Sequence, residues 1–335
     1  MKKRYWFVLF LLLILVITFF SGPRIPDPVY DTELPNVPED LAELEEYIMK
    51  QEAQQPLRKD NRARIIWQDP DDPQKTEYSL VYLHGFAGSY RDGYPVNVHI
   101  ADSLDANLFL ARWAGHGLKP PASLDNFSAD AAWNSAKEAL QIGRRIGRKV
   151  IIMSTSTGGT LALKLAATYP EKVYALINMS PNIEDDMDGA FLLNSPWGYE
   201  LAQLVSLGAD KKIEHEEKAA VQYWDTIYPS RALVDLQVLV STTMTEETFS
   251  DVHCPVLTLF YHDNFMKEDD HIEVDDLPEM HAALGTAKSE KKLVALEEPE
   301  THFLGSNIKS RNTEVVEKVI IEFLKEVLGI SFEES

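Results

Sequence analysis

Val150-Ile151-Ile152-Met153-Ser154-Thr155-Ser156-Thr157-Gly158-Gly159 is the stretch that decides the fold of this chain. Its apolar first half is typical of a buried strand, and residues 160–167, which follow it, are good helix formers. A serine at the apex of a tight strand-to-helix turn is the pattern of a nucleophile elbow, although Ser154 stands where the usual Gly-x-Ser-x-Gly pattern has its first glycine. The plainer alternative is an ordinary turn in which a hydroxyl side chain caps the helix.

The composition sets limits on the class of protein. The chain has 335 residues, of which 45% are hydrophobic, enough for a sizeable core. Its net charge of -21 argues against nucleic acid or an anionic lipid surface as a partner, since phosphate binding needs clustered Lys and Arg. Cys254 is the single cysteine, so no disulfide can form within the chain.

The N-terminus carries a hydrophobic segment. Three basic residues at positions 2–4 precede an apolar run over residues 5–20 that only Thr18 interrupts. As a helix the run would reach about 24 Å, a little short of a ~30 Å hydrocarbon core. Because no small-residue cleavage site follows it, we expect residues 1–21 to be an uncleaved membrane anchor, the alternative being a signal segment that is removed. Both interpretations place the rest of the chain on the exported side of the membrane. With an anchor the protein stays attached, and with a cleaved signal segment it is secreted or periplasmic.

The remaining chain alternates between strand and helix patterns. Five prolines within residues 22–38 predict an extended, semi-rigid linker, and residues 39–335 are predicted to form one domain. Helices are predicted over residues 39–55, 129–145, 160–167 and 313–328, and strands over residues 64–67, 78–83, 107–111, 150–153, 171–180, 255–261 and 292–296. The alternation predicts an α/β fold, with a mostly parallel sheet covered by helices on both faces.

One segment, at about residues 181–251, breaks this alternation. It has helical stretches and aromatic side chains but no clear strand. We interpret it as a helical lid over the carboxyl edge of the sheet; the alternative is a set of extra helices packed on the outside.

A serine nucleophile needs a base, a group that orients the base, and donors for the oxyanion. His302, a few residues after the last predicted strand, is the best candidate base. The backbone N–H groups of Phe86, which follows His84-Gly85, and of Thr157, at the start of the helix, are the candidate oxyanion donors. Ser156 is the candidate nucleophile, with an acid expected between it and His302.

Taken together, these motifs resemble the α/β-hydrolase superfamily, in particular its lid-bearing monoacylglycerol lipases and carboxylesterases. The likeness spans about residues 60–330 and rests on Tyr82-Leu83-His84-Gly85-Phe86, Gly115-His116-Gly117, the elbow, an acid after a Pro-Val-Leu strand, and the late His302. The resemblance implies the α/β-hydrolase fold, the order serine, acid, histidine along the chain, and no cofactor.

The acid is chosen by the same resemblance. Asp263, Asp269 and Asp270 all follow the strand at residues 255–261. Asp270-His271-Ile272-Glu273-Val274 matches the family's aspartate, with aliphatic residues after it, better than the sequence following Asp263. We therefore predict Asp270 as the acid, with Asp263 as the second choice and Asp269 as the third.

These inferences predict a serine hydrolase that cleaves carboxylic esters of apolar or lipid-like acyl groups through an acyl-enzyme on Ser156. An acyltransferase or thioesterase of the same fold and a non-catalytic anchored binding protein are the alternatives. The expected partners are a small-molecule or lipid ester and, through the N-terminal segment, a membrane; the oligomeric state stays open. No metal is expected, because the spacing of His262, Asp263, Asp270 and His271 fits no recognised ligand pattern.

Overall fold

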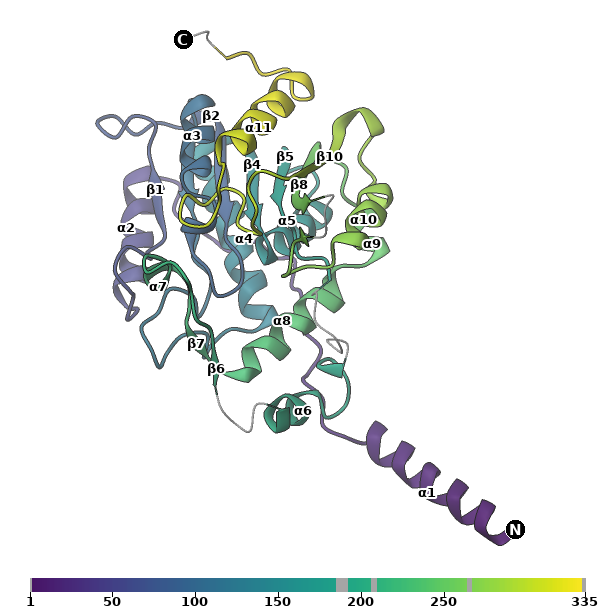
Figure 1. The fold of residues 1–335 in the computed structure, drawn as a ribbon. Helices are drawn as coiled ribbons and strands as arrows, with labels where there is room; N and C mark the ends of the chain where they lie inside the picture. Colours follow the sequence, from purple (N-terminus) through teal and green to yellow (C-terminus); the bar gives the residue numbers. More distant parts are fainter. Residues whose placement is uncertain (1, 185–191, 206–209, 264–266, 333–335) are drawn as a thin grey trace.

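A mostly parallel sheet forms the centre of the computed structural model, which describes residues 2–184, 192–205, 210–263 and 267–332 (Figure 1). Its strand order is β1-β3-β2-β4-β5-β8-β10. The strands are β1 (Arg64–Ile66), β2 (Thr76–Leu83), β3 (Asn107–Leu110), β4 (Gly147–Thr155), β5 (Ala175–Met179), β8 (Val256–Asp263) and β10 (Lys291–Leu296). Along this order only β1 and β3 pair antiparallel. Each predicted strand is confirmed, as is the mostly parallel sheet.

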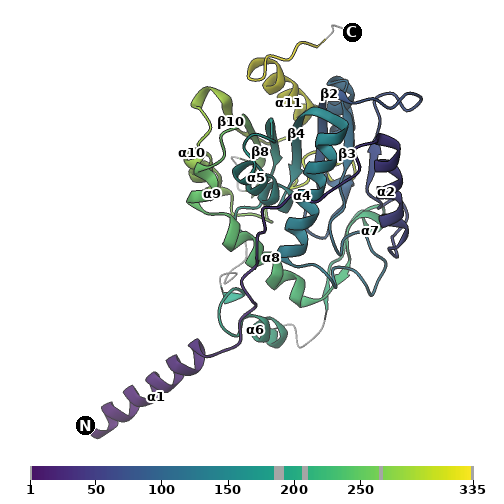
Figure 2. The ribbon, with the colours of Figure 1, turned by 180° about the vertical axis from the view of Figure 1, so that it is seen from behind.

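Helices cover both faces of the sheet, as predicted. On one face lie α4 (Ala129–Ile146) and α5 (Thr157–Thr168), and on the other lie α3 (Val96–Ser103) and α11 (Glu314–Glu326) (Figures 1 and 2). Alternate residues of β4 belong to the two cores, Val150 and Ile152 to the first and Ile151 and Met153 to the second. Burial on both faces explains why the strand reads as an unbroken apolar run.

Two further helices are α2 (Leu41–Ala53), beside β1, and α10 (Leu277–Ala283). The helix α2 was predicted, whereas α3 and α10 were not. α3 and α10 have only 8 and 7 residues, too few for a helical period to stand out in the sequence.

The segment between β5 and β8 is mainly helical, as expected for a lid. It carries α6 (Gly198–Val205), α7 (Ala220–Tyr223), α8 (Ser230–Thr243) and α9 (Glu246–Ser250). It also contains an antiparallel pair, β6 (Lys211–Lys212) and β7 (Ile227–Tyr228), so the prediction of no strand is wrong. Two-residue strands give no alternation that a sequence could reveal. Residues 185–191 and 206–209 of the predicted lid lie outside the described residues.

The proline-rich segment at residues 23–37, here called the strap, runs extended along α4. The Trp133 indole N–H donates to the Asp31 carbonyl at 2.7 Å, and the Lys137 ammonium contacts the Asp31 carboxylate at 3.0 Å. At the α8 side, the Tyr30 hydroxyl shares a 2.6 Å hydrogen bond with Thr242. Val37, at the end of the strap, is 1% exposed. The strap therefore joins α4 to α8 and is packed on the domain along its length.

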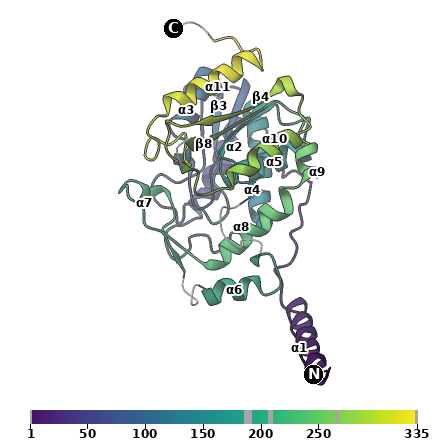
Figure 3. The same ribbon diagram turned by 45° about the vertical axis from the view of Figure 1, so that its right-hand side comes forward.

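An apolar helix, α1 (Lys2–Phe20), projects from the body beside α6 (Figures 1 and 3). Residues 4–18 of this helix are exposed to solvent; Trp6, for example, is 70% exposed. The Trp197 indole N–H donates to the carbonyls of Thr18 and Phe19, at 3.1 Å each, and so holds the end of α1 against the segment that precedes α6. Within the part of the chain that the structure describes, no helix reaches the combined length and hydropathy needed to cross a membrane.

The strap can be tested with two valines that undergo the same chemical change. Val37→Ala should lower the free energy of unfolding by about 2 kcal/mol, because it removes buried methyl groups and leaves a small cavity. Val29→Ala, in the same strap but 75% exposed, should change it by less than about 0.5 kcal/mol. Denaturant unfolding of the full chain in detergent gives both values. Equal effects of the two substitutions would contradict a packed strap.

Candidate active site

Ser156 occupies the turn between β4 and α5, at the carboxyl edge of the sheet. Its backbone is left-handed, with φ 56° and ψ -125°, a conformation that costs free energy in a residue other than glycine. Backbone hydrogen bonds on both sides hold it there: its N–H donates to Met179 at 3.1 Å, and its carbonyl accepts from Gly159 at 2.7 Å and Asn182 at 3.0 Å. A strained serine held this way has the geometry of the predicted nucleophile elbow.

Glycines make room for the turn. A Cβ on Gly158 would lie 2.1 Å from the Leu83 carbonyl oxygen, and one on Gly159 would lie 2.4 Å from the Pro181 Cβ. Across the turn, a Cβ on Gly85 would lie 3.0 Å from the Ser156 Cβ. The chain following β2 therefore approaches Ser156 closely, as the oxyanion prediction requires.

Ser154 stands where the usual pattern has a glycine, and its side chain is accommodated within the strand. It lies within β4, fully buried, and its hydroxyl donates to the Asn178 side-chain oxygen at 2.8 Å. Within the elbow the left-handed backbone belongs to Ser156 and not to Ser154. A serine is accommodated here because the strand needs no positive φ and β5 supplies a partner for the hydroxyl.

The Phe86 N–H lies between two paired amides of its loop. On either side of it, the Gly85 N–H donates to Asp92 at 2.6 Å and the Ala87 N–H donates to His116 Nε2 at 3.1 Å. The Phe86 N–H makes no hydrogen bond to any residue within the described ranges. The Thr157 N–H is the first of α5, where an amide has no partner within the helix. Both predicted oxyanion donors thus lie beside Ser156 on backbone that other contacts hold in place.

Two neutral histidines and a buried carboxylate fix this loop. Burial lowers the pKa of His84 to about 4 and takes the pKa of His116 well below its ordinary value. His116 Nδ1 donates to the Ala114 carbonyl at 3.0 Å, which leaves Nε2 free to accept the Ala87 N–H. Burial also raises the pKa of Asp92, which accepts the Gly85 N–H, to about 7. His84 and His116 therefore serve to hold the loop in place.

His302 follows β10 and is bonded to Asp269. Its Nδ1 lies 2.8 and 2.7 Å from the two Asp269 carboxylate oxygens, and both side chains are buried. Burial alone would raise the pKa of Asp269, but the charge and hydrogen bond of His302 outweigh it and hold that pKa below its ordinary value. The other ring nitrogen of His302, Nε2, is buried without a partner among the residues described. The carboxylate fixes the tautomer with the proton on Nδ1 and leaves Nε2 able to accept one.

The prediction that Asp270 orients His302 is wrong. The Asp270 side chain is 85% exposed and pairs at 2.6 Å with Nδ1 of His271. Asp263, the alternative, ends β8 and pairs in register with Lys267 of β9 (Lys267–Glu268), an antiparallel strand that lengthens the loop before the acid. Asp269 and Asp270 are adjacent in an irregular loop, so no periodicity could show which of them faces inward.

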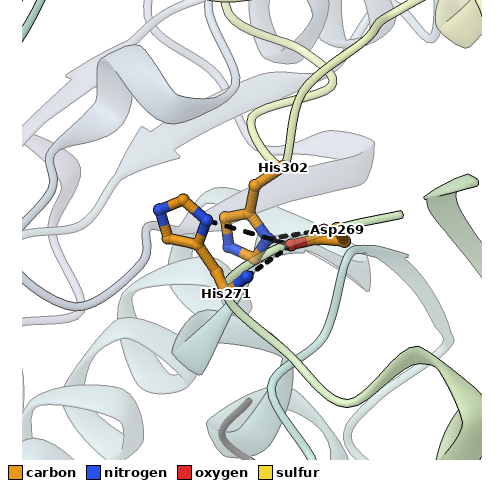
Figure 4. Close-up of side chains that lie close together, drawn as sticks. All are labelled: Asp269, His271 and His302. Carbon is orange, nitrogen blue, oxygen red and sulfur yellow. Dashed lines mark hydrogen bonds and ion pairs between the residues drawn. The ribbon is translucent and has the colours of Figure 1, made fainter. Parts of the chain in front are cut away.

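Asp269, His271 and His302 are close enough to suggest a metal site (Figure 4). The two imidazole rings, however, are stacked at 4.6 Å between centroids with 11° between their planes. Ring nitrogens bind a metal in the plane of the ring at about 2.0–2.1 Å, and two nearly parallel planes this far apart do not converge on one such point. The arrangement fits an aromatic stack better than a metal centre.

Aromatic side chains surround the oxyanion loop. The Phe86 ring packs edge-to-face against Phe127 and against Tyr228 of β7, with centroids 5.2 and 5.4 Å apart. On the His302 side, Phe303 packs against Trp224 at 5.4 Å. The segment between β5 and β8 thus contributes apolar surface on both sides of the site.

Known proteins share this architecture. A family model described as the alpha/beta hydrolase fold matches residues 78–229. The structure resembles one reported for the metagenome-derived lipolytic enzymes LipS and LipT, with a TM-score of 0.63 and 16% identity over 80% of this chain and 99% of that one. It also resembles a monoacylglycerol lipase from Paleococcus ferrophilus, with a TM-score of 0.56 and 14% identity over 78% and 97% of the two chains.

A third structure, Est1E from Butyrivibrio proteoclasticus with ferulic acid bound, has a TM-score of 0.53 and 16% identity over 80% and 96%. No curated protein sequence matches significantly. The chain has the α/β-hydrolase fold. At these identities the structural likeness speaks for the fold alone.

Two adjacent carboxylates allow a matched test of the acid. Asp269→Asn should lower kcat at neutral pH by roughly a thousandfold or more, because an amide no longer holds the imidazole in the required tautomer. Asp270→Asn should stay within about fivefold of the wild type, since its carboxylate faces solvent. Initial rates on an activated ester measure both. If kcat fell further in Asp270→Asn than in Asp269→Asn, Asp270 would be the acid, as the sequence predicted.

Proposed function

We propose that this protein is a serine hydrolase that cleaves carboxylic esters of apolar or lipid-like acyl groups. The observation that carries the proposal is the buried Asp269–His302 pair, whose free ring nitrogen, His302 Nε2, has no partner within the described ranges. A buried polar atom without a partner needs an explanation, and accepting the proton of a nucleophile provides one. Ser156 stands at the same edge of the sheet, in the strained turn after β4.

In the proposed reaction the Ser156 hydroxyl attacks the ester carbonyl carbon as His302 Nε2 takes its proton. Asp269 holds the Nδ1 proton and balances the charge that forms on the imidazole. The N–H groups of Phe86 and Thr157 stabilise the tetrahedral oxyanion. His302 then gives the proton to the departing alcohol, and water, activated by the same ring, releases the acid and restores Ser156.

The acyl preference is supported by the aromatic rings beside the site. Phe86, Phe127 and Tyr228 form one group, and Trp224 and Phe303 another. Such rings favour an apolar acyl chain over a charged one. The lipolytic enzymes and the esterase that share the fold are in keeping with an ester substrate.

A fluorophosphonate probe tests the nucleophile. The wild type should be labelled covalently, and Ser156→Ala should not. Ser154→Ala, which removes a buried hydroxyl two residues away, is the matched control and should still be labelled. Hydrolysis of nitrophenyl esters of short and long acyl chains, with the same three proteins, separates a hydrolase from a binding protein. Labelling that survives Ser156→Ala would overturn the assignment.

Membrane attachment through α1 is also part of the proposal, with the hydrolase on the exported side. It is supported by the apolar side chains along α1, such as Phe7 and Leu15, which are 62% and 66% exposed. Exposed apolar surface on this scale is typical of an interaction site. Exposed leucines at positions 192 and 204 carry the apolar surface onto the neighbouring lid segment.

Vesicle flotation tests this attachment. The full chain should rise with neutral phospholipid vesicles in a density gradient, and a chain beginning at residue 22 should not, because apolar side chains gain free energy on leaving water. N-terminal sequencing of the native protein should find an intact N-terminus. A native chain that begins near residue 22 would refute the uncleaved anchor.

A further inference from the structure

His271 lies against the proposed base although it has no part in the reaction described above. Its ring stacks on His302 face to face, at 4.6 Å (Figure 4). Phe303 packs edge-to-face against both rings. The His271 side chain is 50% exposed, whereas that of His302 is 1% exposed. One face of the buried base is thus covered by a ring that solvent reaches.

His271 is itself held by carboxylates. Its Nδ1 lies 2.6 Å from an Asp270 oxygen, and its backbone N–H donates to an Asp269 oxygen at 3.1 Å. Two Asp–His pairs therefore lie side by side: Asp269 with His302 inside, and Asp270 with His271 outside. The hydrogen bond from the His271 backbone N–H links the two pairs, because its acceptor, the Asp269 carboxylate, also binds His302.

We propose that His271, held by Asp270, is a positioning residue that keeps the His302 ring in place. Through its exposed ring it also makes the charge of His302 depend on the pH of the solvent. The inference rests on the proposed function, in which His302 must become an imidazolium. A neutral ring stacked on an imidazolium stabilises it through the π face. A protonated ring at the same distance repels it.

The charges around His271 decide how often it is protonated. Partial burial lowers the pKa of His271, but the hydrogen bond and charge of Asp270, with the charge of Asp269, outweigh burial and raise that pKa above its ordinary value. The positive charge of Lys309, which is paired with Glu217, opposes the protonation of His271. The ring of His271 faces that of His302. His271 is therefore protonated at a higher pH than a free histidine.

The sign of the effect follows from the charge on His271. As the pH falls and His271 gains its proton, the cation makes His302 a weaker base. Coupled groups titrate in two steps, so the acid side of the profile of kcat/KM should have two steps. Between them the rate should lie about two- to fivefold below the plateau, the range for a partly screened pair of charges.

Three substitutions separate charge from packing. His271→Phe keeps an aromatic ring without the charge, so the acid side should become a single step. Asp270→Asn should lower the pKa of His271 and move the upper step to lower pH. His271→Ala removes the ring, and kcat should fall about two- to tenfold at every pH with little change in KM, as expected for loss of an aromatic pair.

Asp275→Asn is the matched control, because it removes an exposed carboxylate a few residues away. Its profile should remain that of the wild type. A shift as large as that of Asp270→Asn would mean that net charge is responsible, and the proposal would be overturned. So would a single acid step in the wild type that matches the one in His271→Phe.

A second measurement does not depend on catalysis. NMR titration of the imidazole C–H signals should show His302 titrating at a higher pH in His271→Phe than in the wild type, because the neighbouring cation is gone. Identical His302 curves in the two proteins would disprove the coupling, even if ester hydrolysis were normal. If the His302 curve shifts but the protein hydrolyses no ester, the proposed function is overturned and the coupling between the two histidines is supported.

Discussion

The left-handed backbone of Ser156 is the constraint on which the rest of the site depends. Its cost is offset by three backbone hydrogen bonds, to Met179, Gly159 and Asn182. The bonds to Met179 and Asn182 form because β4 and β5 pair in a register that brings Thr155 opposite Met179. The same turn requires that Gly158 lie almost against the Leu83 carbonyl, which brings the end of β2 next to the serine. The register of the sheet, the strain of the turn and the position of the loop after β2 thus depend on one another.

Histidines around the site fall into two electrostatic classes. His84 and His116 are buried and have no carboxylate partner among the residues that the structure describes. Burial keeps them neutral, and their nitrogens serve as fixed hydrogen-bonding groups for the loop after β2. His302 is just as buried but is bonded to Asp269. A buried imidazolium is costly unless a negative charge compensates it. The position of the carboxylate therefore decides which histidine can change its charge.

The strap gives the N-terminal region a structural role. Hydrogen bonds from Trp133 and Lys137 of α4 fix Asp31, and Tyr30 reaches Thr242 of α8. α8 belongs to the segment inserted between β5 and β8, so the strap ties that segment to the layer of helices beneath it. Trp197 adds a contact between the same segment and the end of α1. The orientation of α1 is in this way linked to the lid.

The sequence alone determined the fold and most of the site, because the features concerned are local. Apolar runs predict the strands, and a small-residue turn after β4 singles out Ser156. His302, Phe86 and Thr157 are each marked by their place at the end of a strand or the start of a helix. Tertiary structure alone decided between Asp269 and Asp270, because two adjacent residues of an irregular loop differ only in which side chain faces inward. The stack of His271 on His302 likewise depends on two loops meeting that lie about thirty residues apart in the sequence, and no local pattern encodes such a meeting.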